Sequence, residues 1–284
     1  TSFCESLKLD PDVMIRRQLA WSLRTADQPI ALLAQLMLDP DLIVARMALE
    51  SALSHSDRSA PAAAKSLGHL FDAPDARIRF LASQIASRTP ELDKLVLKHA
   101  STTPLGELTL HFSAALKKSA DAKKAIPLAI AISIQSAHPV DVRLQALRLL
   151  QLLHGDMSGG QKPPVFDGYA GATNSDITAL ATKHHLQQQL LKSFPADNSE
   201  LNREILRTLA VFGVPQQPLT PQSASKLVRA LQVETDPVTE IHLLITLARL
   251  GLPREGSDLE LVAESLLSIP IELNRLGANR DSNW

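Results

Sequence analysis

The sequence Asp10-Pro11-Asp12-Val13-Met14-Ile15-Arg16 joins a helix-starting turn to a β-branched residue and an arginine, and it leads into an apolar helical stretch. The same step returns at three later places. Its β-branched and arginine positions are Ile15 and Arg16, Val44 and Arg46, Ile78 and Arg79, and Val142 and Arg143. The β-branched positions are 29, 34 and 64 residues apart, and the last interval is close to two units of 32. The sequence therefore repeats, with a degenerate copy near residue 110, where His111 stands roughly in the place of the arginine.

Each repeat has the pattern of two helices. Prolines mark helix starts, as at Pro40, Pro74 and Pro139, because the first residue of a helix has no partner for its N–H. Between the prolines, apolar residues recur three or four positions apart, which is the helical period, and strict alternation over the length of a strand is nearly absent. Stacked two-helix units of about 30 residues form an α-solenoid. The sequence predicts an all-α fold, an armadillo-type α-solenoid of stacked antiparallel helix pairs.

The repeat pattern is interrupted once, between residues 154 and 175. This segment contains five of the eleven glycines and predicts a long loop, which is usually either functional or mobile. We therefore expect repeats over 1–153, the loop over 154–175, and further helical hairpins over 176–284 that lack the clear arginine step. The helices expected in the last part span 177–194, 200–212, 223–231, 238–250 and 259–267. Because the chain starts without Met and stops after a polar stretch, we expect it to be a piece of a longer protein.

Composition excludes several classes of protein. The 284 residues are 45% apolar, which is enough to bury a large core, so the chain is not disordered. The formal net charge of −1 and the 4% aromatic content argue against a nucleic-acid partner. The most apolar run, residues 125–134, is about half the length that a spanning helix needs, so no membrane insertion is expected. The one cysteine, Cys4, cannot form a disulfide within the chain or a Cys-x-x-Cys motif.

The β-branched–arginine step, with the Asp-Pro turn before it, resembles the HEAT repeat family. The resemblance covers residues 10–153 well and residues 176–270 less closely. It implies that the repeat arginines bond to backbone or to an aspartate in an adjacent unit. We accordingly interpret Arg16, Arg79 and their counterparts as structural residues, with no catalytic, cofactor-binding or metal-binding role.

Three further phrases, at residues 15–23, 201–210 and 279–284, are similar to the central helical part of bacterial PVC-type haem-binding proteins. Those proteins resemble membrane-bound dehydrogenases, in which a β-propeller precedes the HEAT repeats and a c-type cytochrome domain follows them. The resemblance implies a periplasmic or exported protein with haem bound elsewhere in a parent chain. This chain has no Cys-x-x-Cys-His, so it holds no covalent haem of its own.

Little in the sequence supports a catalytic or metal-binding site within the chain. His184 and His185 are adjacent, so on one helix they point about 100° apart and do not chelate one ion well. Four histidines among apolar residues are expected to be packing residues, namely His69, His99, His111 and His242. Asp156, Asp167 and Asp176 could gather around a cation, but their spacing is too wide to specify a site. A solvated loop is the preferred interpretation of that segment.

Three functions remain open from the sequence. The preferred one is a non-catalytic scaffold or spacer segment of a larger haem- or dehydrogenase-type redox protein, with flanking domains of the same chain as partners. The second is a free-standing HEAT adaptor that binds a protein or peptide on its concave face. The third is an enzyme that uses the 154–175 loop around Asp167 and Tyr169.

Overall fold

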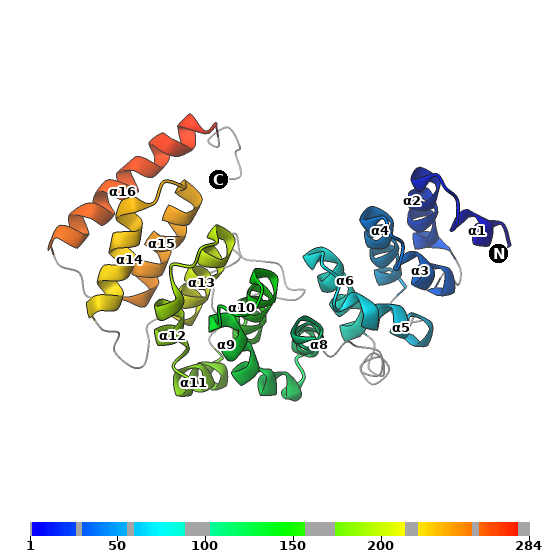
Figure 1. The fold of residues 1–284 in the computed structure, drawn as a ribbon, viewed down its shortest axis with the longest axis horizontal. Helices are drawn as coiled ribbons and strands as arrows, with labels where there is room; N and C mark the ends of the chain where they lie inside the picture. Colours follow the sequence, from blue (N-terminus) through cyan, green and yellow to red (C-terminus); the bar gives the residue numbers. More distant parts are fainter. Residues whose placement is uncertain are drawn as a thin grey trace. The chain divides into compact units, whose positions relative to one another are not determined.

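The computed structural model describes residues 2–26, 30–55, 60–88, 103–156, 174–213, 221–251 and 256–277. Within these ranges the chain forms fifteen α-helices and two 3-10 helices, and it contains no strand (Figure 1). The all-α class that the helical period predicted is thereby confirmed. Across the described ranges, every helix is too short or too polar to span a lipid bilayer.

The chain divides into two compact units, Thr1–Ala125 and Ile126–Trp284. This division into compact units does not test the expected series of repeats over 1–153, a loop over 154–175 and hairpins over 176–284, which stays a prediction. Residues 157–173 of that loop lie outside the described residues, so the expectation of a long loop there stays a prediction.

The N-terminal unit consists of helices that pack in two rows. Helix α2 packs on α4, α4 on α6 and α6 on α8, while α3 packs on α5 in the second row (Figure 1). Its elements are α1 (Ser2–Leu7), α2 (Val13–Ser22), η1 (Leu23–Thr25), α3 (Ile30–Leu36), α4 (Leu42–Leu53), α5 (Ala60–Leu70), α6 (Ala76–Arg88), α8 (Pro104–Leu116) and η2 (Ala120–Ala125). The α3–α4 and α5–α6 contacts join the rows, so consecutive helices pack in pairs, which is compatible with a helical repeat.

Buried hydroxyl groups join helices within each row of this unit. The Ser51 Oγ on α4 donates to the Ala20 carbonyl on α2 at 2.7 Å, and the Ser66 Oγ on α5 donates to the Ala34 carbonyl on α3 at 2.6 Å. A small residue at the contact lets the two backbones approach, and the hydroxyl then satisfies its own hydrogen-bonding need inside the core. Polar side chains therefore fit among the apolar ones without leaving buried donors unpaired at these two positions.

The C-terminal unit continues the pairwise packing. Helix α10 packs on α9 and on α13, α13 packs on α15, and α14 and α16 pack on α15 and on each other. The elements are α9 (Ile126–Ile134), α10 (Val140–His154), α11 (Ser175–Lys183), α12 (Leu186–Ser193), α13 (Ser199–Phe212), α14 (Pro221–Val233), α15 (Pro237–Leu250) and α16 (Gly256–Arg275).

The expected single helix over 177–194 is wrong, because two helices lie there. Helix α11 ends at Lys183 and α12 begins at Leu186. Between them His185 has a φ of 53°, a left-handed conformation that breaks the helical path. The two short helices pack against each other and both contact α9, and Ile177, Leu186 and Leu190 are buried. The other expected helices of this part are present, and α16 runs past Pro270 to Arg275.

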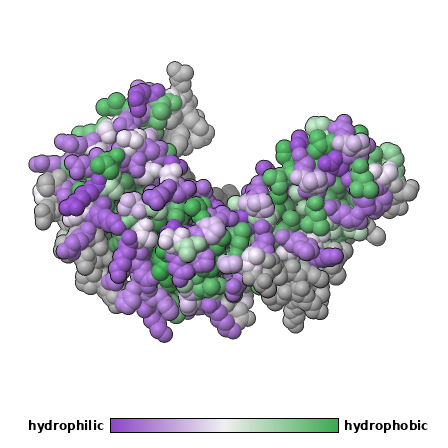
Figure 2. Space-filling view, viewed as in Figure 1, coloured by the Kyte–Doolittle hydropathy of each residue, from purple (hydrophilic) through white to green (hydrophobic). Residues whose placement is uncertain are grey.

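Exposed apolar side chains gather on the helices nearest the two chain ends. On the N-terminal unit they lie on α1, α2, α4 and the adjoining turns, and Figure 2 shows hydrophobic residues at the surface of this unit. On the C-terminal unit they lie mainly on α16. The five most exposed are Leu9, Val233, Leu267, Phe3 and Ile271.

We expect Leu206→Asp to unfold the C-terminal unit. Leu206 on α13 is fully buried, and a carboxylate placed there has no cation to pair with, so the free energy of unfolding should fall by about 4 kcal/mol or more. Leu267→Asp is the matched control, because Leu267 on α16 is 74% exposed, and it should change stability by less than about 0.5 kcal/mol. Urea denaturation followed by circular dichroism measures both. Equal effects of the two substitutions would contradict the burial of α13.

Candidate functional site

Three of the four repeat arginines occupy the same position relative to the start of their helix, which we call the register. Helix α2 is capped by Asp12 and α10 by Pro139, while Asp75 directly precedes α6 and accepts a hydrogen bond from the Ile78 N–H at 3.0 Å. Three of the predicted arginines are the fourth residue after these starting residues. They are Arg16, Arg79 and Arg143.

Side chains in this register bind the turn or helix that comes before their own helix. Arg79 is 2% exposed and donates from Nη1 to the Ala73 and Pro74 carbonyls at 2.7 and 3.0 Å. Arg143 is buried and donates from Nε to the Ser133 carbonyl, near the end of α9, at 3.0 Å. Burial lowers the pKa of Arg143 from its ordinary value. Both arginines therefore supply donors to carbonyl groups at turns and helix ends.

Arg16 adds a carboxylate to the same arrangement. Its Nη1 donates to the Asp10 carbonyl at 2.7 Å, and its Nε and Nη2 donate to the two carboxylate oxygens of Asp39 at 2.8 and 3.1 Å. Asp39 lies in the turn before α4, so this bidentate pair joins two successive turns. The hydrogen bond to Asp39 raises the pKa of Arg16.

Arg46 differs from the other three. It is the fifth residue after the N-cap Asp41, so it is rotated by about 100° from the register. Arg46 is exposed, and the buried residue in the register is Ala45. Of the β-branched positions, Val44, Ile78 and Val142 are buried, whereas Ile15 is exposed.

The same register recurs in the C-terminal unit, where the sequence showed no clear arginine step. Asn202 is the fourth residue after the N-cap Asn198 of α13. Its Oδ1 accepts from the Ala196 N–H at 2.7 Å, and its Nδ2 donates to the Ala196 carbonyl at 2.9 Å. An amide thus takes the place of the guanidinium. The repeat pattern in the sequence does not reveal it, because an asparagine stands where the other copies have an arginine.

A second pairing uses the fifth residue after the N-cap. Arg17 on α2 donates to Asp41, the N-cap of α4, and the distance from Nη2 to Oδ2 is 2.9 Å. Arg203 on α13 donates to Asp236, the N-cap of α15, with Nη2 to Oδ2 at 2.8 Å. Each aspartate therefore caps a helix and pairs with a cation. The hydrogen bond from Arg17 is the main reason why the pKa of Asp41 lies below its ordinary value.

A buried polar cluster lies between α10 and α13, next to the start of the predicted loop. The Asp156 side chain is fully covered, and one of its oxygens accepts from Nε and Nη2 of Arg207, both at 3.0 Å. The Gln151 Nε2 donates to Glu204 at 2.8 Å and to Thr208 at 3.0 Å. Gly155 ends α10 with a φ of 107°, a left-handed conformation that glycine adopts easily, and the chain turns there into Asp156.

His154 lies beside this cluster and is 1% exposed. Its ring contacts the ring of Phe212 with centroids 4.4 Å apart, and its Nε2 lies 3.3 Å from the Thr178 hydroxyl. Its Nδ1 has no hydrogen-bond partner among the residues that the structure describes. Burial lowers the pKa of His154 below the ordinary histidine value, because it disfavours the charged ring.

The groups proposed for metal binding do not come together in the described part of the chain. Asp156 is paired with Arg207, Asp176 is exposed on the first turn of α11, and Asp167 lies outside the described residues. His184 ends α11 while His185 precedes α12, so this pair is not on one helix. Among the described residues, no three His, Cys, Asp or Glu side chains are placed to hold one ion.

The expected packing histidines have different surroundings. His111 and His242 are partly buried, and burial lowers the pKa of both. His69 is exposed on α5, so the expectation that it packs among apolar residues is wrong. His99 lies outside the described residues.

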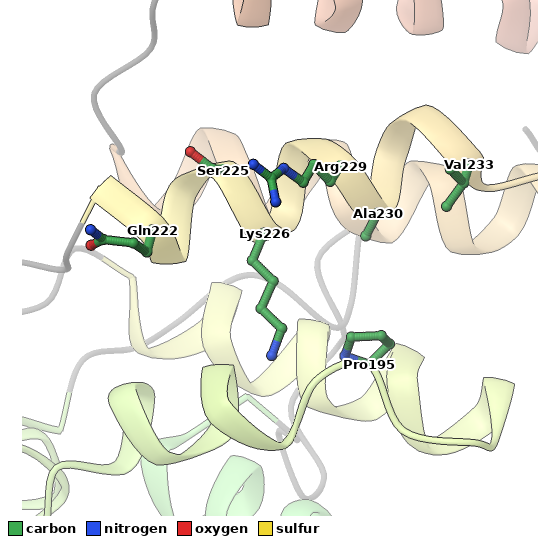
Figure 3. A pocket seen from close by; sticks show the side chains of 7 residues that line it. All are labelled: Pro195, Gln222, Ser225, Lys226, Arg229, Ala230 and Val233. Carbon is green, nitrogen blue, oxygen red and sulfur yellow. The ribbon is translucent and has the colours of Figure 1, made fainter.

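An open groove runs along α14, beside the segment between α12 and α13 (Figure 3). Its volume is about 640 Å³. Figure 3 shows Lys226 reaching from α14 toward the segment that carries Pro195, with Ala230 above the proline ring. The described residues that line it are Pro195, Gln222, Ser225, Lys226, Arg229, Ala230 and Val233. The two charged side chains among them are both cations. The sequence analysis did not find this groove.

No protein-family model matches the chain, and no curated protein matches it. Among solved structures, the crystal structure of an engineered protein, a target of the Northeast Structural Genomics Consortium, shares 14% sequence identity. The match has a TM-score of 0.40 and covers 88% of this chain and 95% of that one. At this degree of likeness, the comparison carries no argument about function.

We expect Arg79→Ala to lower the free energy of unfolding by about 2–3 kcal/mol, because the Ala73 and Pro74 carbonyls lose a charged donor that is itself buried. Arg46→Ala is the matched control. It removes the same side chain from an exposed position of the next helix in the row, and it should change stability by less than about 0.5 kcal/mol. Chemical denaturation of both variants makes the comparison. If they lose stability equally, the register does not stabilise the turn.

We expect the stability of the protein to fall as the pH drops below neutrality, in part because of His154. Its folded pKa is depressed, so the unfolded chain takes up a proton at a higher pH than the folded one. The stabilising contribution is therefore complete above the unfolded pKa, about 6.5, and is lost as the pH falls below it. His154→Gln should make the pH dependence of the melting temperature shallower, while His69→Gln, at an exposed position, should leave it unchanged. An unaltered slope in His154→Gln would contradict this assignment.

Proposed function

We propose that this chain is a non-catalytic helical-repeat scaffold of the HEAT type, whose stacked helix pairs hold other protein parts at a defined spacing. The observation that carries the proposal is the polar side chain four residues after the start of a helix, which binds the backbone of the preceding turn or helix. It occurs at Arg16, Arg79, Arg143 and Asn202. Because it recurs in both units, it supports a chain built from one repeated helical step.

The charged side chains between α10 and α13 support a structural role. Asp156 pairs with Arg207, and Glu204 accepts from Arg148 at 3.2 Å and from Gln151 at 2.8 Å. A general base or a nucleophile needs a side chain that reaches a substrate, whereas these side chains bind one another between two helices. The same pairs hold α10 against α13.

The finer proposal is that the scaffold is a spacer segment in a larger, exported redox protein of the PVC-type haem-binding kind. It rests on the resemblance of the phrases at 15–23, 201–210 and 279–284. In this proposal the haem belongs to a flanking domain, and residues 1–284 contribute position and no redox chemistry.

The second candidate is a free-standing adaptor that binds a protein or peptide. The observation in its favour is the groove along α14, where two cations lie beside apolar side chains. A spacer does not require such a surface, whereas an adaptor does.

The coding sequence on both sides of this segment separates the two candidates. The spacer proposal expects an upstream β-propeller and a downstream Cys-x-x-Cys-His, because covalent haem needs both thiols and the axial histidine. A start codon directly before Thr1 together with a stop codon directly after Trp284 would contradict the spacer and favour the adaptor. Flanking domains of another kind would contradict the haem assignment while keeping the scaffold.

A further inference from the structure

We propose that the groove along α14 binds an extended segment of a partner protein that carries a carboxylate next to an apolar side chain. This inference deepens the adaptor form of the proposed function, because it names the surface and the chemistry of the ligand. It does not depend on the HEAT or haem assignments.

One face of α14 supplies a row of binding groups. Gln222, Ser225, Arg229 and Val233 follow one another at intervals of three or four residues, so they lie along one side of the helix. The row extends over roughly 16 Å, at about 1.5 Å of rise for each residue. That length corresponds to about five residues of an extended peptide. The amide of Gln222 and the hydroxyl of Ser225 can both donate to and accept from a peptide backbone.

The two cations of the groove have different roles. The Nζ of Lys226 donates to the Leu191 and Lys192 carbonyls at 2.9 and 3.3 Å, so Lys226 binds carbonyl groups at the end of α12 and forms one wall. Arg229 is exposed, and no hydrogen bond or ion pair joins it to any residue in the described ranges. Its guanidinium is therefore available for a bidentate pair with a carboxylate from a partner.

Carboxylates close to the groove in the sequence do not neutralise Arg229. Glu234 follows Val233, but its Oε1 accepts from the N–H groups of Thr235 and Asp236, both at 2.9 Å. Asp236 in turn caps α15 and pairs with Arg203. Neither Glu234 nor Asp236 therefore has a hydrogen bond or an ion pair with Arg229, and the two charged residues that line the groove are both cations.

The apolar part of the groove favours a peptide over other anions. Val233 is 76% exposed and lies on the same helix face as Arg229, while Pro195 and Ala230 lie on the two sides of the groove (Figure 3). A nucleic acid normally engages several cations together with aromatic stacking, and no aromatic residue is among the described residues that line the groove. A short acidic–apolar segment matches one free guanidinium beside a valine.

The test uses the intact chain and synthetic peptides of about seven residues, labelled for fluorescence polarisation. One set places Glu beside Leu or Val at the centre, and the matched set has Gln in place of Glu. We expect the Glu peptides to bind and the Gln peptides to bind at least tenfold more weakly. Arg229→Glu should weaken the Glu peptides by at least tenfold and should favour peptides with Lys at that position. Val233→Asp should also weaken binding of the Glu peptides.

Arg46→Glu is the matched control, because it makes the same charge change at an exposed arginine of the other unit and should leave binding unchanged. Circular dichroism and melting temperatures confirm that each variant is folded. The proposal is overturned if no Glu peptide binds, if Arg229→Glu binds as the natural chain does, or if a single-stranded oligonucleotide competes better than the peptides. The flanking coding sequence is independent of these results, so failure of the groove leaves the scaffold proposal standing.

Discussion

Turns between packed helices leave carbonyl groups that need donors, and the described part of the chain meets this need by one recurring device. The side chain four residues into the next helix points back toward the turn and supplies the donor. Arg79 and Arg143 do so from buried positions, and Asn202 does so with an amide. A carbonyl left without a donor costs more stability than an ordinary hydrogen bond gains, so this contact favours one placement of α2, α6, α10 and α13 relative to the segment before each of them. The packing of these four helices depends in part on that placement.

A second set of contacts sets the distance between alternate helices. Arg17 on α2 and Arg203 on α13 each reach the aspartate that caps the α-helix two places along the chain, which is α4 or α15. The cap therefore does two things at once, because it binds the free N–H groups of its own helix and accepts from a neighbouring cation. Buried hydroxyls such as Ser51 add direct bonds to the backbone of the partner helix. The same combination is present in both units, although the residues differ.

In the scaffold that we propose, the surface carries the function and the interior does not. The side chains of the polar cluster around Asp156 and Arg207 bind one another and hold α10 against α13. The groove on α14 is different, since Arg229 has an exposed guanidinium that nothing in the described part of the chain occupies. A scaffold can carry such a surface without any change to its core, because the buried side of α14, with Leu227 and Leu231, is separate from the exposed side.

The sequence by itself determined the all-α class, the starts of most helices and the arginine step at Arg79 and Arg143, because these depend on local spacing and on capping chemistry. The sequence did not show that Arg46 differs from the other repeat arginines. Arg46 is the fifth residue after its N-cap and not the fourth, and this difference turns its side chain outward although the same residue types are present. Only the tertiary structure decided the break at His185, where two short helices pack against each other and against α9. It alone also decided the groove, because Pro195 and Arg229 are far apart in the chain and become neighbours through packing. Local interactions depend on short stretches of sequence and can be predicted from them, whereas a surface made by distant segments exists only after the helices have packed.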